Sequence, residues 1–169
     1  FILDEIMYIN LSGLNILVTG ASRGLGKAIA TKLAEAGATI AVHYNKNMND
    51  AESLAQVMGN ESKAFQADLS DSGEAVKLFE RVVLELGSIE ILINNAGNAH
   101  GLDFIHEGKI EDWDMMIDTN VKGLLYVSKP VLDIMIKNNN GHIINIGSIA
   151  GKEVYPKGNI YCASKFAVD

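Results

Sequence analysis

The sequence has one cysteine and two prolines in 169 residues. A single thiol, Cys162, cannot form a disulfide within the chain, which is typical of proteins from a reducing compartment. We therefore expect a cytoplasmic protein. No apolar run approaches the roughly 18 residues that a membrane-spanning helix requires, so we expect no membrane partner.

Basic residues are also scarce. Fourteen lysines and arginines stand against 21 aspartates and glutamates, which gives a net charge of −7. An acidic chain without a basic cluster is poorly suited to binding nucleic acid, so we expect no such partner. The histidines show no metal-ligand spacing with the cysteine, and we expect no metal site. They are His43, His100, His106 and His142.

The composition that remains is that of a globular domain. Hydrophobic residues make up 48% of the chain, and 16 glycines can supply tight turns. Residues 1–6 contain no basic residue and do not form a signal peptide. We expect one domain over residues 7–169, with Met7 as its start and residues 1–6 as upstream or added sequence. Because the last expected helix is unfinished at Asp169, we expect a C-terminally truncated chain.

Hydrophobic patterning predicts strands that alternate with helices. Continuously apolar runs predict strands at 16–19, 39–44, 63–67, 89–93 and 142–146. Helical spacing predicts helices at 25–36, 50–58, 71–86 and 111–137, the last interrupted at Gly123 and Pro130, and one from residue 160 onward. In the first helix, Ala28, Ile29, Leu33 and Ala36 form the expected buried face. The pattern predicts an α/β fold with a doubly wound parallel sheet of strand order 3-2-1-4-5.

The first chemical motif lies between the first strand and the first helix. Residues 19–26 read Thr-Gly-Ala-Ser-Arg-Gly-Leu-Gly, with Gly20, Gly24 and Gly26 as the glycines. Glycines here allow a sharp turn, a close approach to a pyrophosphate and tight packing of the helix on the sheet. The free N–H groups at the helix start then favour phosphate. A plain strand–helix turn is the alternative reading.

The end of the second strand bears on the choice of cofactor. In dinucleotide-binding folds, an acidic residue here binds the ribose 2′-hydroxyl of NAD. This strand instead ends in His43-Tyr44-Asn45-Lys46, and Arg23 in the glycine turn adds a second positive charge. These residues favour NADP over NAD. Alternatively, Arg23 and Lys46 are solvated surface charges.

Tyr161 and Lys165 are four residues apart, so they lie on one face of the last expected helix. A nearby ammonium group favours the phenolate, which suits the tyrosine to acid–base chemistry. The alternative for this pair is a surface stack.

Further polar residues follow the expected strands. Asp68 follows the third strand, residues 94–97 (Asn-Asn-Ala-Gly) close the fourth, and Ser148 follows the fifth. Ser148 can contact a substrate or cap a turn, Asp68 can bind an adenine amino group or cap a turn, and the asparagines can satisfy nearby backbone groups. Asn120 lies inside a helix, where asparagine is unfavourable, so it marks a kink, a site or a solvated position.

In their order and spacing, these motifs resemble those of the short-chain dehydrogenase/reductase family, from about Leu11 to the end of the chain. The resemblance implies a Rossmann fold, incomplete at its C-terminal edge, and an NADP-dependent oxidoreductase. It implies Tyr161 as general acid/base, Lys165 as the residue that lowers its pKa and holds the nicotinamide ribose, Ser148 as the group that orients the substrate oxygen, and Asn120 as the holder of a water. The implied cofactor-binding residues are Gly20, Ser22, Arg23, Gly24, Leu25, Gly26, Tyr44, Asn45, Asp68, Leu69, Asn94, Ala96, Gly97, Tyr161 and Lys165.

Within the family, the first half resembles 3-oxoacyl-carrier-protein reductases. From Asn94 onward the chain is more similar to NADP-dependent 3-hydroxy acid or serine dehydrogenases. The resemblance implies a small carbonyl or alcohol substrate and a homo-oligomer, a dimer or a tetramer. A non-catalytic NADP sensor, an inactive reductase fragment and a flavodoxin-like domain are the alternatives.

Overall fold

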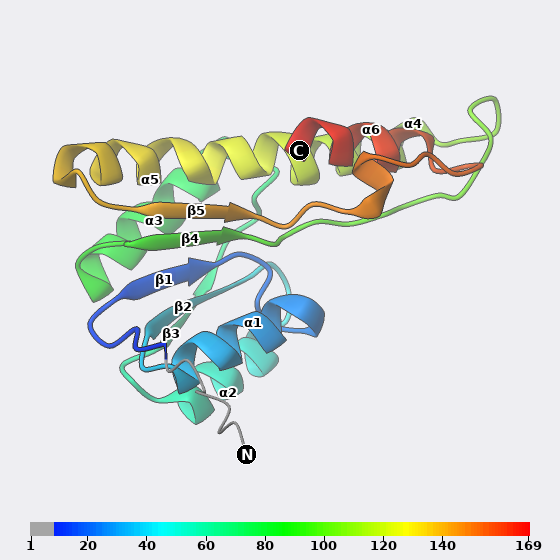
Figure 1. Ribbon diagram of the computed structural model, residues 1–169. Helices are drawn as coiled ribbons and strands as arrows, with labels where there is room; N and C mark the ends of the chain where they lie inside the picture. Colours follow the sequence, from blue (N-terminus) through cyan, green and yellow to red (C-terminus); the bar gives the residue numbers. More distant parts are fainter. Residues whose placement is uncertain (1–8) are drawn as a thin grey trace, which may run out of the picture.

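The computed structural model describes residues 9–169, so the expectation for residues 1–6 lies outside the described part. Five strands run parallel in the order β3-β2-β1-β4-β5 (Figure 1). This order confirms the predicted doubly wound sheet. The strands are β1 (Asn15–Val18), β2 (Thr39–Tyr44), β3 (Lys63–Gln66), β4 (Ile91–Asn94) and β5 (His142–Asn145).

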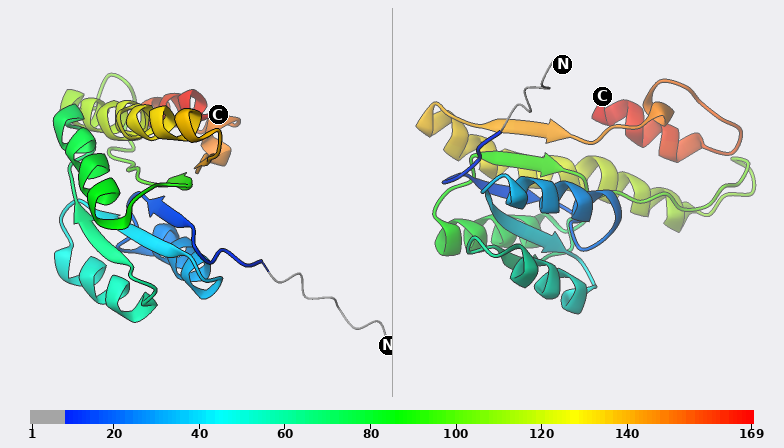
Figure 2. Two further views of the ribbon diagram at one scale, coloured as in Figure 1. Left: turned by 90° about the vertical axis from the view of Figure 1, so that its left-hand side faces the viewer. Right: turned by 60° about the horizontal axis from the view of Figure 1, so that its bottom comes forward.

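Helices connect the strands and cover both faces of the sheet (Figure 2). They are α1 (Gly24–Glu35), α2 (Met48–Met58), α3 (Ser72–Leu86), α4 (Ile110–Ile117), α5 (Leu124–Asn138) and α6 (Asn159–Val168). A π-helical turn, η1 (Asp118–Gly123), joins α4 to α5, and a short 3-10 turn, η2 (Ile149–Gly151), follows β5.

Alternate strand residues face opposite sides of the sheet, which creates two hydrophobic cores. Ile16 and Val18 of β1 pack under α1 and α2, whereas Leu17 packs with α3 and α5. All three side chains have no exposed surface. Burial on both faces explains why the strands read as continuous apolar runs.

Helix α1 differs from expectation in the face that it buries. The buried residues are Gly26, Ala30 and Ala34, whereas Ala28, expected to be buried, is exposed. Expected Ile29 and Leu33 are half-buried at the edge of the contact. Small residues let the helix lie close to β1 and β2, so size decided the contact face more than hydrophobicity did.

The long helical stretch is interrupted at only one of the two expected places. A Cβ on Gly123 would lie 2.9 Å from the backbone oxygen of Leu69, so glycine permits close packing at the π turn. Pro130, in contrast, lies inside α5, which continues through it. Val127 and Val131 on both sides of the proline are fully buried, and this packing offsets the missing backbone hydrogen bond.

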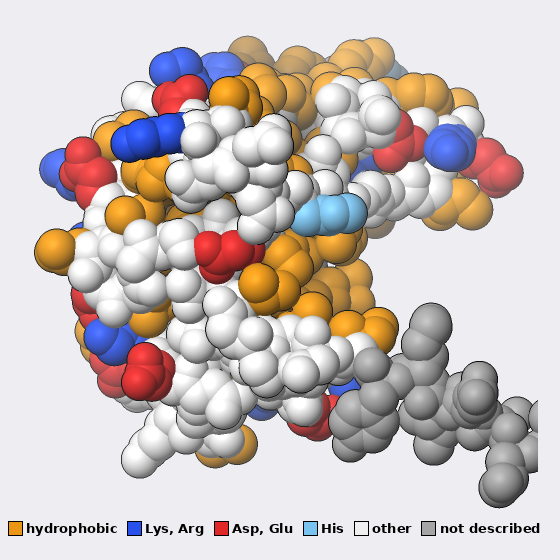
Figure 3. Space-filling view, turned by 60° about the vertical axis from the view of Figure 1, so that its left-hand side comes forward, with side chains coloured by type: hydrophobic (Ala, Val, Ile, Leu, Met, Phe, Trp, Pro, Cys, Tyr) orange, Lys and Arg blue, Asp and Glu red, His pale blue; other side chains and the backbone are white. Residues whose placement is uncertain are grey.

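Strand β5 lies at the edge of the sheet. Its Ile144 pairs in register with Ile93 of β4, yet Ile144 is 41% exposed whereas Ile93 is 3% exposed. Ile93 faces the side of the sheet that α1 and α2 cover. These helices lie over β1 and β2 and do not extend over β5. Figure 3 shows a hollow on one side of the molecule, with hydrophobic side chains gathered in it.

The two cores allow a direct test on one helix. Leu78 of α3 has no exposed surface, whereas Leu84 of the same helix is 85% exposed. We expect Leu78→Ala to lower the free energy of unfolding by about 2–5 kcal/mol. The control, Leu84→Ala, should change it by less than about 0.5 kcal/mol. Chemical denaturation measures both values, and similar losses in the two variants would contradict the placement of α3.

Candidate active site

The glycine turn leads from β1 into α1 at the carboxyl edge of the sheet. Gly20 and Gly24 have φ angles of +65° and +57°, which residues with a side chain rarely adopt. A Cβ on Gly26 would lie 2.4 Å from Nδ2 of Asn95. Each glycine is therefore required either by the path of the turn or by the closeness of its neighbours.

A cleft of about 730 Å³ opens over this turn. Among the described residues, no side chain caps the start of α1 at Arg23, and the first turn of the helix contains no acidic residue. The backbone N–H groups there remain free for an anion, so the turn fits a phosphate-bearing dinucleotide. Most of the expected cofactor-binding residues line the cleft: Gly20, Ser22, Arg23, Gly24, Leu25, Gly26, Asn45, Asp68, Leu69, Ala96 and Gly97.

Charged residues of the cleft come from the loops after three strands. Arg23 and Lys46 are both exposed and both line the cleft. Asp68 accepts a 2.6 Å hydrogen bond from the hydroxyl of Ser70. This bond, with smaller effects from Asn45 and Lys46, holds the pKa of Asp68 below its usual value. The cleft thus offers two cations and one well-stabilised carboxylate.

Four expected cofactor-binding residues do not line this cleft: Tyr161 and Lys165 of α6, described below, and Tyr44 and Asn94. The side chain of Tyr44 is 4% exposed and packs in the core under α1 and α2. Asn94 is 5% exposed, and its Nδ2 donates to Ser128 Oγ and Asn145 Oδ1. Neither lines the cleft, because strand alternation turns both side chains into the protein.

Asn95 and Thr19 join the end of β4 to the glycine turn. The Nδ2 of Asn95 donates to the backbone oxygens of Thr19 and Gly20, at 2.8 and 3.2 Å. The hydroxyl of Thr19 accepts from the backbone N–H groups of Asn95 and Ala96, both at 2.9 Å. Sequence analysis allowed the asparagines of residues 94–97 to satisfy nearby backbone groups, and Asn95 does so here.

His43 is a buried residue of the cleft region, to which the sequence analysis gave no role of its own. Its Nδ1 accepts a 2.9 Å hydrogen bond from the backbone N–H of Gly20. Its Nε2 lies 3.1 Å from the backbone oxygen of Ala67. Burial, opposed by the bond to Ala67, lowers the pKa of His43 to about 4, so the ring is neutral at physiological pH. The sequence could not assign these ring contacts, because Gly20 and Ala67 are 23 and 24 residues away along the chain.

Asn120 lies in the π turn and is 2% exposed, so it is not a solvated residue. Its Oδ1 accepts from the backbone N–H of Asn98, and its Nδ2 donates to the backbone oxygen of Asn98, both at 2.8 Å. The Nδ2 also donates to Ser164 Oγ at 3.0 Å. Asn120 therefore ties the loop after β4 to α6.

The same helix, α6, holds Tyr161 and Lys165. Lys165 is 8% exposed, and its Nζ donates to the backbone oxygen of Ile146 at 2.9 Å. Burial lowers the pKa of this lysine, against the opposing effect of Asp169. A Cβ on Gly97 would lie 3.8 Å from Lys165 Nζ, which places the ammonium group next to a residue of the cleft. A surface stack of the pair is excluded by the burial of Lys165.

Ser148 follows β5 and begins the turn η2. Its hydroxyl oxygen accepts a 3.2 Å hydrogen bond from the backbone N–H of Ala150. The oxygen thus caps the turn, while the hydroxyl proton can still be donated to another group. Ser148, Tyr161 and Lys165 lie in elements that pack together, because η2 and α6 are in contact.

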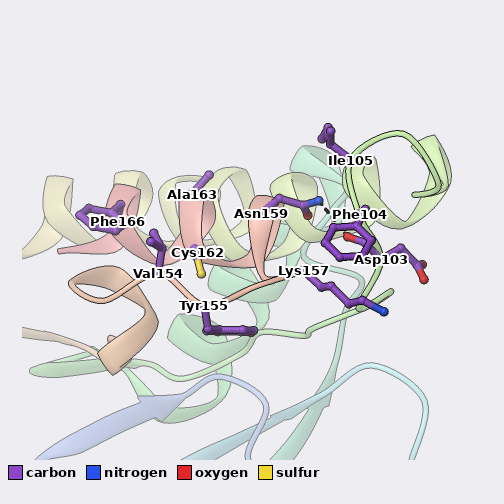
Figure 4. Close-up of a pocket in the computed structure, with 10 residues that line it drawn as sticks. All are labelled: Asp103, Phe104, Ile105, Val154, Tyr155, Lys157, Asn159, Cys162, Ala163 and Phe166. Carbon is purple, nitrogen blue, oxygen red and sulfur yellow. Dashed lines mark hydrogen bonds between the residues drawn. The ribbon is translucent and has the colours of Figure 1, made fainter.

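A second cavity, of about 430 Å³, lies beside α6 (Figure 4). Two loops line it beside the helix, and a hydrogen bond of 3.2 Å from Asn159 Nδ2 to the backbone oxygen of Asp103 joins the start of α6 to one of them. The ammonium group of Lys157 lies 5.1 Å from the ring centre of Phe104. Tyr155 also lines the cavity, and burial, with smaller effects from Cys162 and Tyr161, raises its pKa. The walls are largely apolar.

Two further searches cover residues 9–169 only. In that part of the chain, no helix combines the length and the hydrophobicity needed to cross a membrane. Within the same range, no group of three or more histidine, cysteine or acidic side chains is arranged to hold a metal ion.

Comparison with known proteins agrees with this geometry. The family model for short chain dehydrogenases matches residues 14–169. An NADP-dependent 3-hydroxy acid dehydrogenase of Salmonella typhi is 38% identical over 150 residues, which are 89% of this chain and 60% of that protein. The chain thus spans about 60% of the length of such curated relatives.

Solved structures with the same fold include two dehydrogenases with a bound cofactor. The closed form of a serine dehydrogenase complexed with NADP⁺ has a TM-score of 0.86 and 37% identity, covering 90% of this chain and 61% of that one. A gluconate 5-dehydrogenase from Burkholderia cenocepacia, in complex with NADP and tartrate, has a TM-score of 0.87 and 30% identity. The match covers 95% of this chain and 64% of that one.

His43 should make stability depend on pH. Its pKa is about 4 in the folded protein against 6.5 ordinarily, so between these values the unfolded chain binds more protons. Its contribution to stability is complete above about pH 6.5 and decreases as the pH falls toward 4. We expect wild type to lose roughly 3 kcal/mol more than His43→Asn over this window. Denaturant unfolding at several pH values measures the difference, and parallel curves would contradict a neutral His43.

Proposed function

The chain belongs to the short-chain dehydrogenase family, and on this premise we propose that the protein is an NADP(H)-dependent oxidoreductase. The proposed reaction transfers a hydride between the nicotinamide and a carbonyl or secondary alcohol. The observation that carries this proposal is the buried ammonium of Lys165 beside Gly97, on the same helix as Tyr161 and next to the cleft of the glycine turn. A buried cation costs stability, so a buried lysine four residues after a tyrosine on one helix supports acid–base chemistry.

We propose that the cleft holds NADP. The free N–H groups at the start of α1 and the glycines of the turn would bind the pyrophosphate. Asp68 would meet the adenine, while Arg23 and Lys46 would pair with the 2′-phosphate. The two relatives whose structures contain NADP support this choice. When bound, the nicotinamide supplies or accepts the hydride.

Tyr161 is the proposed general acid and base. During reduction of a carbonyl, its phenol would donate the proton that the oxygen receives, and it would take the proton back during alcohol oxidation. Lys165 would stabilise the phenolate form and hold the nicotinamide ribose. The bond from Lys165 Nζ to Ile146 fixes the ammonium group in place before any ligand binds.

Ser148 and Asn120 have supporting roles in this proposal. The hydroxyl of Ser148 retains its proton for donation, so it would orient the substrate oxygen. Asn120 would hold a water that links Lys165 to solvent. Its bonds to Asn98 and Ser164 already fix its amide, so the position of that water would be fixed too.

The proposed substrate is a small 3-hydroxy acid or the corresponding 3-oxo compound. The names of two relatives support this class, because serine is itself a 3-hydroxy acid. An assay of NADP reduction with serine, other 3-hydroxy acids and 3-hydroxyacyl thioesters tests it. Binding of NADP without turnover of any of these compounds would instead favour a sensor.

We propose that the protein is a homo-oligomer, a dimer or a tetramer, and that it is cytoplasmic. Large apolar side chains are exposed on α5 and α6, including Leu125, Ile136 and Phe166 at 57%, 72% and 50%. An exposed apolar surface of this kind is usually covered by a partner. Sedimentation of the full-length protein measures the number of subunits. The single buried cysteine supports the cytoplasmic location.

The proposed role of Tyr161 leads to a test by mutation. We expect Tyr161→Phe in the full-length protein to reduce kcat by about 10²–10⁴-fold, because only the transferable proton is removed. Binding of NADPH, followed by fluorescence, should be nearly unchanged. The matched control is Tyr126→Phe, which removes a phenolic hydroxyl from α5. This variant should keep the activity of the wild-type enzyme. A wild-type rate in Tyr161→Phe would refute the assignment.

Cofactor preference leads to another test. Arg23→Ala should weaken NADPH binding by about tenfold and NADH binding much less, because a charge-assisted contact to the 2′-phosphate is lost only for NADPH. The control is Lys32→Ala, which removes an exposed cation at the far end of α1. Titration calorimetry with both cofactors gives the ratio. Equal weakening for the two cofactors would show that Arg23 does not distinguish them.

A further inference from the structure

We propose that His43 is a positioning residue that fixes the glycine turn for cofactor binding and joins it to the end of β3. This inference rests on the proposed NADP site, but its main contact can be tested without cofactor. The two hydrogen bonds of the His43 ring go to the backbone, to Gly20 on one side and Ala67 on the other. It is not a catalytic residue in this account.

The hydrogen bonds define the protonation of the ring. The backbone N–H of Gly20 can only donate, so Nδ1 of His43 must be an unprotonated acceptor. The remaining ring proton is then on Nε2, which donates to the backbone oxygen of Ala67. Both ring nitrogens are thus used, in the neutral tautomer that carries the proton on Nε2. The low pKa of the buried ring agrees with this state.

The first two peptide units of the glycine turn are held by hydrogen bonds from both neighbouring strands. On the β2 side, His43 accepts from the N–H of Gly20, and its own backbone oxygen accepts from the N–H of Ala21 at 2.8 Å. On the β4 side, Asn95 donates to the backbone oxygen of Gly20. Glycine at φ +65° has wide conformational freedom, so these contacts select one path for the turn.

The other end of the ring reaches the adenine side of the cleft. Ala67 directly precedes Asp68, and both its backbone groups are bonded to β2: its N–H to the oxygen of Tyr44 at 3.0 Å and its oxygen to the ring of His43. The ring of His43, which is 2% exposed, therefore connects the proposed pyrophosphate site to the proposed adenine site. A shift of either end would be transmitted to the other.

The charged groups facing the ring are Asp68 and Arg81. Asp68 raises the pKa of His43 and Arg81 lowers it, and both effects are smaller than that of burial. A protonated ring would lose the acceptor for Gly20, since Nδ1 would then donate. The contact is thus available only to the neutral ring.

Two substitutions separate the two bonds. In His43→Asn, Oδ1 occupies the place of Nδ1 and can still accept from Gly20. In His43→Gln, Nε2 occupies the place of the ring Nε2 and can still donate to Ala67, but the acceptor for Gly20 is lost. We expect His43→Gln to raise the dissociation constant of NADPH by about tenfold, with kcat at saturating NADPH unchanged. His43→Asn should remain within about threefold of wild type.

Hydrogen exchange without cofactor tests the positioning role separately. The amides of Gly20 and Ala21, which are bonded to His43, should exchange about tenfold faster in His43→Gln than in wild type, while His43→Asn stays close to wild type. Wild-type exchange and wild-type NADPH binding in His43→Gln would overturn the inference. So would equally weak binding in both variants, because the Gly20 contact would then not be the cause.

A measurement on the wild-type protein covers the case in which variants fail to fold. Nitrogen-15 chemical shifts of the ring at pH 7 should show a protonated Nε2 and an unprotonated Nδ1. The opposite tautomer or a doubly protonated ring would overturn the inference. If wild type binds no NADPH, the proposed function fails, while the ring shifts and the exchange rates still decide how His43 is bonded.

Discussion

Parallel pairing of β1 with β2 on one side and β4 on the other brings the carboxyl ends of three strands together. The chain leaves each strand there with backbone groups that the sheet no longer satisfies. Thr19, His43 and Asn95, one from each strand end, satisfy part of these groups. Thr19 and Asn95 bond each other's backbones, and His43 accepts from the backbone N–H of Gly20. The shape of the glycine turn, and with it the cleft, depends on this exchange of hydrogen bonds.

The chemistry of α6 is positioned by a different set of contacts. Asn120 bonds the backbone of Asn98 and the hydroxyl of Ser164, and Ser164 Oγ donates to the backbone oxygen of Tyr161 at 2.8 Å. Lys165 bonds the end of β5 through Ile146. The helix that carries the proposed acid–base pair is therefore fixed to the loop after β4 and to β5, and only indirectly to the glycine turn.

Much of the fold could be predicted because burial on both faces makes strands visible as apolar runs, and the glycine turn could be recognised by its position. Other features depend on spatial neighbours. Ala30 and Ala34 are no more apolar than Ala28, so only the closeness of the sheet decides which of them is buried. The inward packing of Tyr44 and the ring contacts of His43 follow from strand alternation and from the position of Gly20, which no local pattern records.

The π turn has a consequence for how this chain tolerates insertions and deletions. A π turn is equivalent to one residue inserted into an α-helix. Deleting one residue within 118–123 would restore an unbroken helix from α4 to α5, and local propensity would improve. It would also rotate one half of the helix by about 100° relative to the other. Asn120 could then not contact Asn98 and Ser164 while Val127 and Val131 remain buried. In this segment, a regular helix and the contacts of Asn120 cannot both form. The one extra residue of the π turn gives up the regular helix and keeps those contacts.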